Sequence, residues 1–204
     1  MSAYHSFDPA EGHRLRHDPI NAIIAPRPIG RISSVSPSGA LNLAPYSYFN
    51  IISLNPPIVM FASEGRKDTV NNVELSGEFV VNLATRNMAE AMSLTSGRYD
   101  PEVNEFILAG LEAVSSDVVS APRVGGVAAA MECRLIEIRR LRDMDGNAVS
   151  SHLVAGQIVR VHIDQQHLVD GMFDLTHAQT IARCGYQGDY VEATSIFQIL
   201  RPRT

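Results

Sequence analysis

The feature that most constrains this chain is a pair of long strand-like segments, Met131 to Leu141 and Leu153 to Asp164, joined around Asp145-Gly146. An Asp-Gly pair between two β-rich segments predicts a hairpin, because glycine readily adopts the positive φ of tight turns. The second segment alternates strictly: one face holds Val159, Val161 and Ile163, and the other holds Arg160, His162 and Asp164. This period of two predicts an antiparallel strand with one face in a core and the other in solvent.

Further strand-like segments precede this hairpin. Ile29 to Val35 and Ala40 to Leu43 flank Ser36-Pro37-Ser38-Gly39, a turn sequence that predicts another hairpin. Pro57 to Ser63 and Gly77 to Thr85 are also β-rich. Because short strands dominate and no β-α-β order is present, the pattern predicts a mainly β fold, a barrel with short helices inserted.

Three short helices are expected. Thr69 to Leu75 has Asp68 or Thr69 as its N-cap and Gly77 near its end. Asn87 to Leu94 is the second helix, and the third starts at Asp100-Pro101 and stops at Gly110.

Length and composition indicate one soluble domain. The 204 residues suffice for a single domain, expected over 21–204, after an N-terminal arm over 1–20 that has little apolar periodicity. No apolar run is long enough for a membrane span or a signal peptide, so we expect a cytoplasmic protein. The net charge of −5 argues against nucleic acid as a partner. Cys133 and Cys184 are expected to be reduced, buried thiols.

Common signatures are missing from the sequence. It has no GxGxxG after a strand, no GxxxxGK[ST], no HExxH and no GxSxG. His13 and His17 have the spacing that would place two imidazoles on one helical face, but an exposed basic arm explains HRLRH equally well. The later histidines, His162 among them, lack an Asp, Cys or His cluster at ligand spacing. The sequence therefore predicts no metal site.

The strongest candidate for ligand binding is the segment from Asn42 to Thr69. Its first half, residues 44–50, mixes small polar groups with aromatic rings, and Pro45 interrupts strand pairing so that backbone polar groups are freed. A flavin ring needs this mixture of apolar faces and polar groups along one edge. A bulged core strand explains the same residues equally well.

The second half of the segment suits a phosphate group. Ser63 ends an apolar strand, and Arg66, Lys67 and Thr69 follow directly before a predicted helix. Hydroxyl groups, cations and the free N–H groups of a helix start are what a phosphate monoester requires. A solvated charged loop is the alternative. At roughly 3.3 Å per residue, five or six residues of strand match the length of a ring, a ribityl-type chain and a phosphate.

Several blocks of the sequence, in this order, resemble the flavin reductase-like, FMN-binding split-barrel family. They cover most of residues 26 to 190, and they read PRPIGRISSVSPSGALNLAPYSYFNIISLNPPIVMFAS, RKDT, GEFVVNLAT, HLVAGQIVRVHID and IARCGYQGDY. The resemblance implies a homodimeric Greek-key split barrel with one FMN per subunit near the interface.

The resemblance also assigns candidate site residues. The flavin ring and ribityl chain would contact Ala44, Pro45, Tyr46, Ser47, Phe49 and Asn50, and the phosphate would contact Ser63, Arg66, Lys67 and Thr69. The substrate side would include Arg183, Gly185 and Tyr190. Where the family often has two glycines after that arginine, this chain has Cys184-Gly185-Tyr186, so Tyr186 is a candidate to fill part of the substrate side.

The activity implied by the resemblance is hydride transfer from NAD(P)H to FMN and onward to a small-molecule or protein electron acceptor. Hydride transfer requires no acid or base, so no catalytic residue is assigned. Two alternatives stay open: a flavoredoxin-like electron carrier and a non-catalytic flavin-binding protein. A barrel of this kind that binds haem or pyridoxal phosphate is the least favoured alternative.

Overall fold

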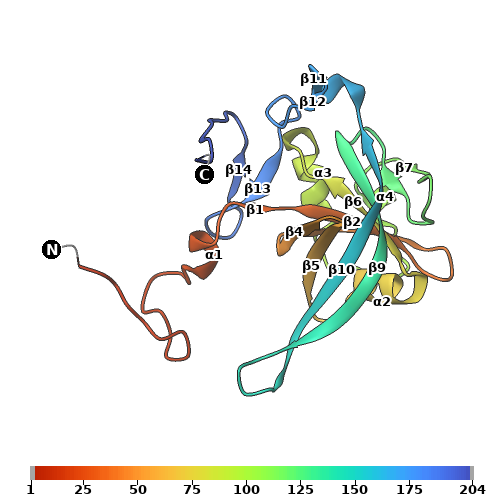
Figure 1. The fold of residues 1–204 in the computed structure, drawn as a ribbon. Coiled ribbons are helices and arrows are strands. Elements are labelled where there is room, and N and C mark those ends of the chain that lie inside the picture. Colours follow the sequence, from red (N-terminus) through yellow and green to blue (C-terminus); the bar gives the residue numbers. More distant parts are fainter. Residues whose placement is uncertain (1–2, 203–204) are drawn as a thin grey trace.

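The computed structural model describes residues 3–202, and its main element is one antiparallel sheet (Figure 1). The seven strands have the order β3-β2-β6-β9-β10-β5-β4. Their bounds are β2 (Gly30–Val35), β3 (Leu41–Tyr46), β4 (Phe49–Leu54), β5 (Pro57–Glu64), β6 (Glu78–Leu83), β9 (Ala129–Arg142) and β10 (Ala148–Ile163). The sheet curves until Tyr46 of β3 packs on Phe61 of β5, with ring centroids 4.6 Å apart. The sheet therefore forms a barrel.

Short elements surround this barrel. The helices are α1 (Ile20–Ile23), α2 (Asp68–Ser76), α3 (Ala89–Leu94) and α4 (Glu105–Leu108), with 3-10 turns η1 (Arg86–Met88) and η2 (Gln165–His167). The small strands are β1 (Arg27–Pro28), β13 (Ile181–Arg183) and β14 (Tyr190–Glu192) in one sheet, β7 (Ala113–Val114) with β8 (Arg123–Val124), and β11 (Leu168–Val169) with β12 (Met172–Phe173). The expected mainly β fold with short helices is confirmed. Within residues 3–202, no helix is long and apolar enough to span a membrane.

The barrel interior is filled by alternate side chains of its strands, as the period of a strand dictates. Phe61 meets Phe79 edge to face at 5.6 Å, and α2 adds Val70 and Val73 to the same core. Gly156 of β10 lies directly beneath Phe79, because a Cβ at this position would come within 2.4 Å of the ring. The absence of a side chain at residue 156 is therefore part of the packing.

A second layer covers the outer face of β2, β3 and β6. Leu43, Phe106 and Val124 form an apolar cluster there. Asn82 joins the layers, since its amide donates to the carbonyl of Arg31 at 3.1 Å and its carbonyl accepts from the N–H of Val124 at 2.8 Å. Buried polar groups on this face are thus satisfied by the segment that covers them.

Both predicted hairpins, β2–β3 and β9–β10, are present, but one face of β10 was predicted wrongly. Val159, Val161 and Ile163 were expected in a core, and they are 36%, 52% and 40% exposed. A bulge lies between Ile158 and Arg160, and the last residues of β10 extend beyond the filled part of the barrel. The alternation of apolar and polar residues correctly predicted a strand, but it did not predict which of its two faces is covered.

The helix predictions also need correction. The N-cap of α2 is Lys67, without a side-chain cap, whereas Asp68 lies inside the helix. The third helix starts at Glu105 instead of Asp100-Pro101, because the side chain of Asn104 caps it by accepting from the N–H groups of Phe106 and Ile107. No helix includes His13 and His17.

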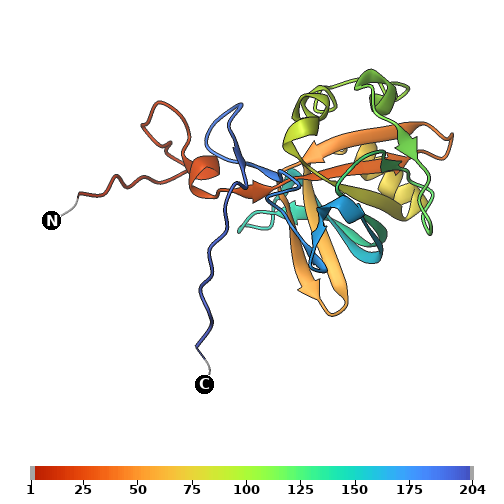
Figure 2. The ribbon, with the colours of Figure 1, turned by 90° about the horizontal axis from the view of Figure 1, so that it is seen from above.

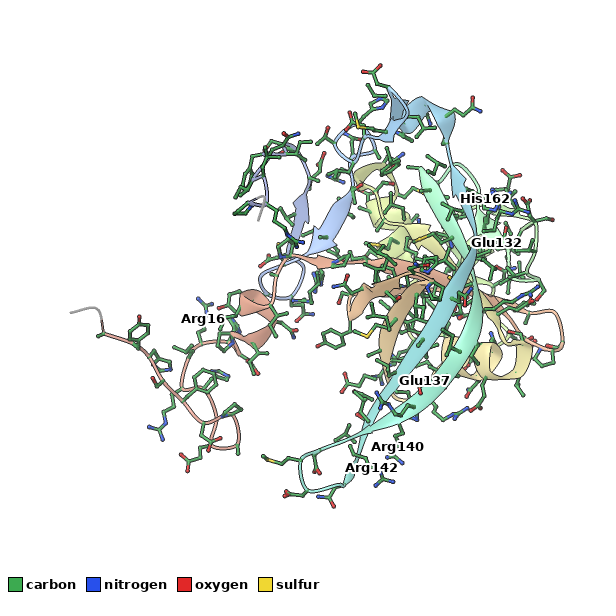
Figure 3. The ribbon with its side chains drawn as sticks, viewed as in Figure 1. Arg16, Glu132, Glu137, Arg140, Arg142 and His162 are labelled. Atoms are coloured by element: carbon green, nitrogen blue, oxygen red, sulfur yellow. The ribbon has the colours of Figure 1, made fainter. Side chains whose placement is uncertain are left out.

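The two ends of the described chain run away from the barrel (Figure 2). Residues before α1 and after β14 are mostly extended and exposed, and the last segment carries the apolar side chains Ile196, Phe197, Ile199 and Leu200. Arg16 lies on the N-terminal segment, far from Glu137, Arg140 and Arg142 along the β9–β10 hairpin (Figure 3).

Both cysteines are free as expected, although Cys184 is only half-buried.

Candidate functional site

A groove runs along the end of β3, between the start of α2 and the segment that follows α3. Its two main parts, of about 370 and 210 Å³, share a wall formed by Ala44, Tyr46, Glu64, Lys67, Thr95, Ser96 and Gly97. A further cavity of about 180 Å³ continues past Pro45 and Ser47 to Arg183 and Tyr190. The groove therefore connects the predicted phosphate residues with the predicted substrate side.

Tyr46 stands at the middle of this groove. Its ring packs into the barrel core, and its hydroxyl is buried without a hydrogen-bond partner among residues 3–202. Burial raises the pKa of Tyr46, so the hydroxyl is protonated at neutral pH. The side chains of Thr69 and Ser63 lie near this hydroxyl and offset part of that rise.

The start of α2 forms one end of the groove. Lys67 is the only lysine in the sequence, lines both main cavities, and occupies the N-cap position without capping the helix through its side chain. The N–H groups of the first turn thus lack a side-chain cap, and they carry the positive end of the helix dipole. Thr69 lines the larger cavity in the same turn.

Two other predicted phosphate residues are engaged elsewhere. Arg66 pairs with Glu74 and donates to Asn71 at 3.2 Å, so its guanidinium follows the outer surface of α2. The hydrogen bond with Glu74 raises the pKa of Arg66 and lowers that of Glu74. Ser63 is fully buried and donates to the carbonyl of Gly65 at 2.9 Å. Arg66, Lys67 and Thr69 all line the larger cavity, whereas Ser63 does not.

Phe49 and Asn50 line a separate apolar cavity of about 470 Å³ that adjoins the groove at Ser47 and Tyr48. The ring of Phe49 lies over Gly30, where a Cβ would come within 2.8 Å of it. Asn50 accepts from the N–H of Ile51 at 2.8 Å. Phe49 and Asn50 therefore lie at the start of β4, next to the groove and outside its lining.

Sequence reasoning missed the segment that closes the groove, Thr95-Ser96-Gly97, directly after α3. Its shape depends on Gly97, because a Cβ there would come within 2.5 Å of the Tyr99 ring, and the Tyr99 hydroxyl donates to the carbonyl of Leu94 at 2.8 Å. A run of small polar residues directly after a predicted helix was the available signal.

A buried polar chain behind the groove was also missed. Thr69 donates to Asn42 at 2.7 Å, and Asn42 donates to Glu105 at 3.0 Å. Glu105 also accepts from the N–H of Leu43 at 3.1 Å, while burial raises its pKa. This chain holds α2, β3 and α4 together and fixes the back wall of the groove.

The predicted substrate side comes together at the far end of the groove. The guanidinium of Arg183 lies over the Tyr190 ring, 4.7 Å from its centroid, and donates to the carbonyl of Asp189 at 3.0 Å. Tyr186 contacts His17 of the N-terminal segment, with ring centroids 5.4 Å apart. Gly185 has a positive φ, and a Cβ there would meet the Asp189 carboxylate at 2.4 Å.

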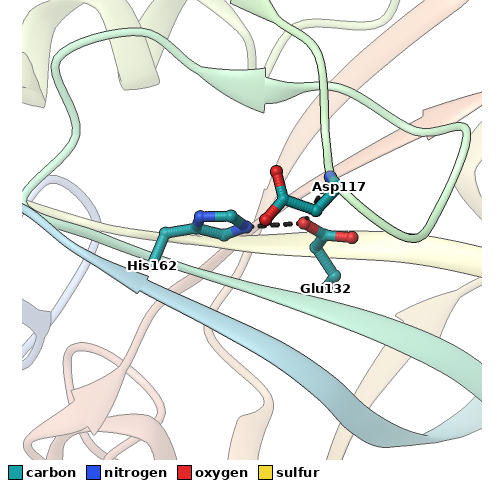
Figure 4. A group of neighbouring side chains, drawn as sticks. All are labelled: Asp117, Glu132 and His162. Carbon is teal, nitrogen blue, oxygen red and sulfur yellow. Dashed lines mark hydrogen bonds and ion pairs between the residues drawn. The ribbon is translucent and has the colours of Figure 1, made fainter.

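One side-chain cluster surrounds His162, a histidine without an Asp, Cys or His cluster at ligand spacing in the sequence. Asp117, Glu132 and His162 face one another on the outer side of β9 and β10 (Figure 4). Glu132 is fully buried and lies 2.5 Å from the imidazole of His162. Burial opposes ionisation of Glu132, but hydrogen bonds from the N–H of Asp117 and from His162 outweigh it and lower the pKa. The three residues are too far apart in sequence for spacing to reveal them.

The protein is a split barrel, as the strand order and the contact between Tyr46 and Phe61 show. A groove lies beside α2, and the end of the groove at the start of this helix suits an anion. The chain belongs to the flavin reductase like domain family, whose model matches residues 24–180. The predicted family and fold are thereby confirmed.

Known relatives and solved structures agree with this assignment. An uncharacterised protein of Aquifex aeolicus is 36% identical over 155 residues, which are 74% of this chain and 76% of the relative. Nitrilotriacetate monooxygenase component B from Bacillus cereus superposes with a TM-score of 0.87 at 30% identity, over 98% of this chain and 100% of that one. The 2-nitrobenzoate 2-nitroreductase of Pseudomonas fluorescens gives a TM-score of 0.79 at 26% identity, over 90% and 88% of the two chains.

Proposed function

We propose that the groove binds FMN and that the protein is an oxidoreductase that takes a hydride from NAD(P)H and passes electrons to a small-molecule or protein acceptor. The observation that carries this proposal is the continuity of the groove. It runs from the uncapped start of α2 at Lys67, past the unpartnered Tyr46 hydroxyl, to Arg183 and Tyr190. Membership of the flavin reductase like domain family supports the same ligand.

The residues present fit the phosphate of FMN. Lys67 and the first-turn N–H groups of α2 supply positive potential. Thr69 would donate its hydroxyl proton to the phosphate only by releasing Asn42, to which it donates at 2.7 Å. Glu64 and Asp68 also line this cavity, so the ammonium of Lys67 balances carboxylates as well as the phosphate. Arg66 contributes less, because reaching a phosphate requires it to leave Glu74.

Phosphate contacts alone do not account for tight binding. A micromolar dissociation constant needs about 8 kcal/mol, whereas one charge-assisted hydrogen bond contributes about 1.5–3 kcal/mol. Burial of the ring between Pro45, Ser47 and the segment after α3 must supply much of the rest. The Tyr46 hydroxyl adds a polar contact between the two ends.

FMN, when bound, supplies the hydride-accepting ring of the reaction. The expectation that Pro45 interrupts strand pairing is wrong, because Pro45 lies inside the edge strand β3 and pairs with Arg31 of β2. The chain then positions the reactants: Pro45 lines the ring end, and the stacked Arg183 and Tyr190 wall the side from which a nicotinamide enters. Arg183 places a positive charge there, which favours an anionic reactant. No side chain is needed as an acid or base for hydride transfer.

We also propose a homodimer, with its interface next to the groove. Exposed apolar side chains gather on α1, on the edge strand β4 and on the C-terminal segment; they are Ile23, Ile24, Ile51, Ile52, Leu54, Phe197, Ile199 and Leu200. Exposed apolar side chains that form one patch mark protein contact surfaces, which is why these residues are assigned to the interface. Light scattering should give twice the chain mass, and deletion of residues 194–204 should shift the protein toward monomer. A monomeric full-length chain would rule the interface out.

The proposal is tested by comparing FMN with riboflavin, which lacks the phosphate. Replacing Lys67 with methionine should weaken FMN binding by at least about tenfold, the loss of one charge-assisted contact, and leave riboflavin binding nearly unchanged. Arg139→Met, at an exposed position on the hairpin, is the matched control and should affect neither ligand. Equal weakening of both ligands by Lys67→Met would mean that Lys67 does not contact the phosphate.

Hydride transfer is tested separately on the FMN-loaded protein. When NADH or NADPH is mixed with this protein without oxygen, the flavin absorption should bleach rapidly as the flavin is reduced. A flavin that stays oxidised with both nucleotides would contradict the reductase activity and favour an electron carrier, while leaving FMN binding intact.

A further inference from the structure

A second group of polar side chains lies outside the groove, where the segment between β7 and β8 crosses the outer face of the long hairpin. Asp117 comes from this segment, Glu132 from β9 and His162 from β10 (Figure 4). Arg160 pairs with Glu132 and His162 pairs with Ala130 in the strand register, so Glu132 and His162 are diagonal neighbours on one face. We propose that Asp117, Glu132 and His162 bind one divalent first-row transition-metal ion, such as Zn²⁺, Mn²⁺ or Co²⁺.

The donor atoms suit such an ion. Two carboxylate oxygens and one imidazole nitrogen are ligand types that these metals accept, and the three atoms all lie within 4.8 Å of one another. An ion with bonds of about 2.0–2.2 Å holds its ligand atoms roughly 3–3.6 Å apart. The distance from Glu132 to His162, now 2.5 Å, would open slightly, and Asp117 would move inward.

Glu132 is already oriented as a ligand would need to be. It is fully buried, and its oxygens accept from the backbone N–H groups of Asp117 at 2.8 Å, Val118 at 2.7 Å and Val119 at 3.1 Å. Outer hydrogen bonds of this kind fix the direction of metal-ligating carboxylates in known sites. The cluster therefore differs from a chance group of exposed acidic side chains: its central carboxylate is immobile, and one ligand is an imidazole.

Metal binding requires one proton to move. Nε2 of His162 shares a proton with Glu132 through their hydrogen bond, and that nitrogen must present its lone pair to the ion. The proton moves to Nδ1 or to solvent, and the ion takes its place between the two side chains. No electron transfer and no second reactant are needed.

A cavity adjoins the cluster at His162, and Asp117 and Glu132 do not line it. His162 lines a cavity of about 500 Å³ together with Arg123, Gly125, Gly126 and Asp164, and water or a small anion fits there. The ion pair that competes for Asp117 is weak, since Arg160 lies 3.6 Å away and both side chains are about half exposed. Different residues line the flavin groove, so this inference does not depend on the proposed function.

Equilibrium dialysis of the full chain tests the site. The protein is stripped with a chelator, dialysed against about 100 µM Zn²⁺, Mn²⁺ or Co²⁺, and analysed for bound metal by mass spectrometry. We expect one ion per chain for at least one of the three metals. Asp117→Asn and His162→Ala should each lower the affinity by at least about tenfold. His177→Ala is the matched control, because His177 packs against another histidine, His167, away from the cluster.

Circular dichroism and urea unfolding establish that the variants are folded. Metal binding that is lost in Asp117→Asn and His162→Ala and kept in His177→Ala supports the site. Less than a tenth of an ion per chain with all three metals overturns it. Binding that both cluster variants retain at wild-type affinity overturns it equally, because the ion would then lie elsewhere.

Discussion

Arg31 offers a quantitative test of the forces in this fold. It lies on β2, is fully buried, and two of its guanidinium nitrogens have no hydrogen-bond partner among residues 3–202. Its one polar contact is from Nη1 to the sulfur of Met88 at 3.4 Å. Desolvation lowers the pKa of Arg31 to about 10. A charge buried without a carboxylate opposes folding.

The magnitude follows from this pKa. At 1.36 kcal/mol for each unit, the charged guanidinium costs the folded state about 3 kcal/mol relative to the unfolded chain. Because the folded pKa is depressed and the group is a base, this cost is fully present below about pH 10 and is relieved as the pH rises above that value. Methionine has a similar length and no charge, so Arg31→Met should raise the free energy of unfolding by about 1–3 kcal/mol at pH 7.

Urea unfolding followed by circular dichroism measures this change, and Arg139→Met on the exposed hairpin is the control, expected within about 0.5 kcal/mol of wild type. The stability gain of Arg31→Met should shrink as the pH is raised from 7 to 10.5, since the wild-type guanidinium then begins to lose its proton. A variant that is destabilised by more than about 1 kcal/mol would refute the reasoning, because it would mean that Arg31 has a compensating partner in the folded protein.

Three further predictions concern packing, charge and reactivity. Gly156→Ala should destabilise the protein by about 1–3 kcal/mol, measured by urea unfolding, because its methyl group would overlap the Phe79 ring; an unchanged midpoint would contradict the packing. The Glu132 carboxylate has a lowered pKa, so its stabilising contribution is present at neutral pH and is lost as the pH falls through that pKa. Glu132→Gln should therefore be less stable than the wild type at pH 7, and its stability should fall less on acidification. Equal loss of stability in acid for the two proteins would contradict this role of Glu132. Cys133 is buried and its pKa is raised, so iodoacetamide at pH 8 should alkylate the half-buried Cys184 first. Peptide mass spectrometry measures the order of alkylation, and modification of Cys133 in the folded protein would contradict the prediction.

Much of the fold could be predicted because the determinants are local. The β2–β3 and β9–β10 hairpins follow from turn residues and alternation, and α2 follows from its length and its closing Gly77. The covered face of β10 could not be predicted, because alternation separates two faces without saying which one another segment covers. The start of α4 was misjudged because Asn104 competes as a cap with Asp100-Pro101, and only tertiary packing selects between them.

The candidate site divides in the same way. Lys67 and Thr69 line the groove because they flank the start of one helix, a relation visible in sequence. The participation of Thr95, Ser96 and Gly97 depends on how α3 packs beside β3, and the Asp117, Glu132 and His162 cluster depends on strand register. Arg66 shows a further limit, since its ion pair with Glu74 of α2 could not be predicted from the sequence, although Arg66 still lines the larger cavity.

The most direct test of the central claim uses the fact that Lys67 is the only lysine. The full chain is treated with an amine acylating reagent with and without saturating FMN, and acylation of Lys67 is followed by peptide mass spectrometry, with the N-terminal amine as internal reference. The account predicts that FMN slows acylation of Lys67 several-fold while riboflavin, without a phosphate, protects it much less. Equal acylation with and without bound FMN would contradict the placement of the phosphate at the start of α2.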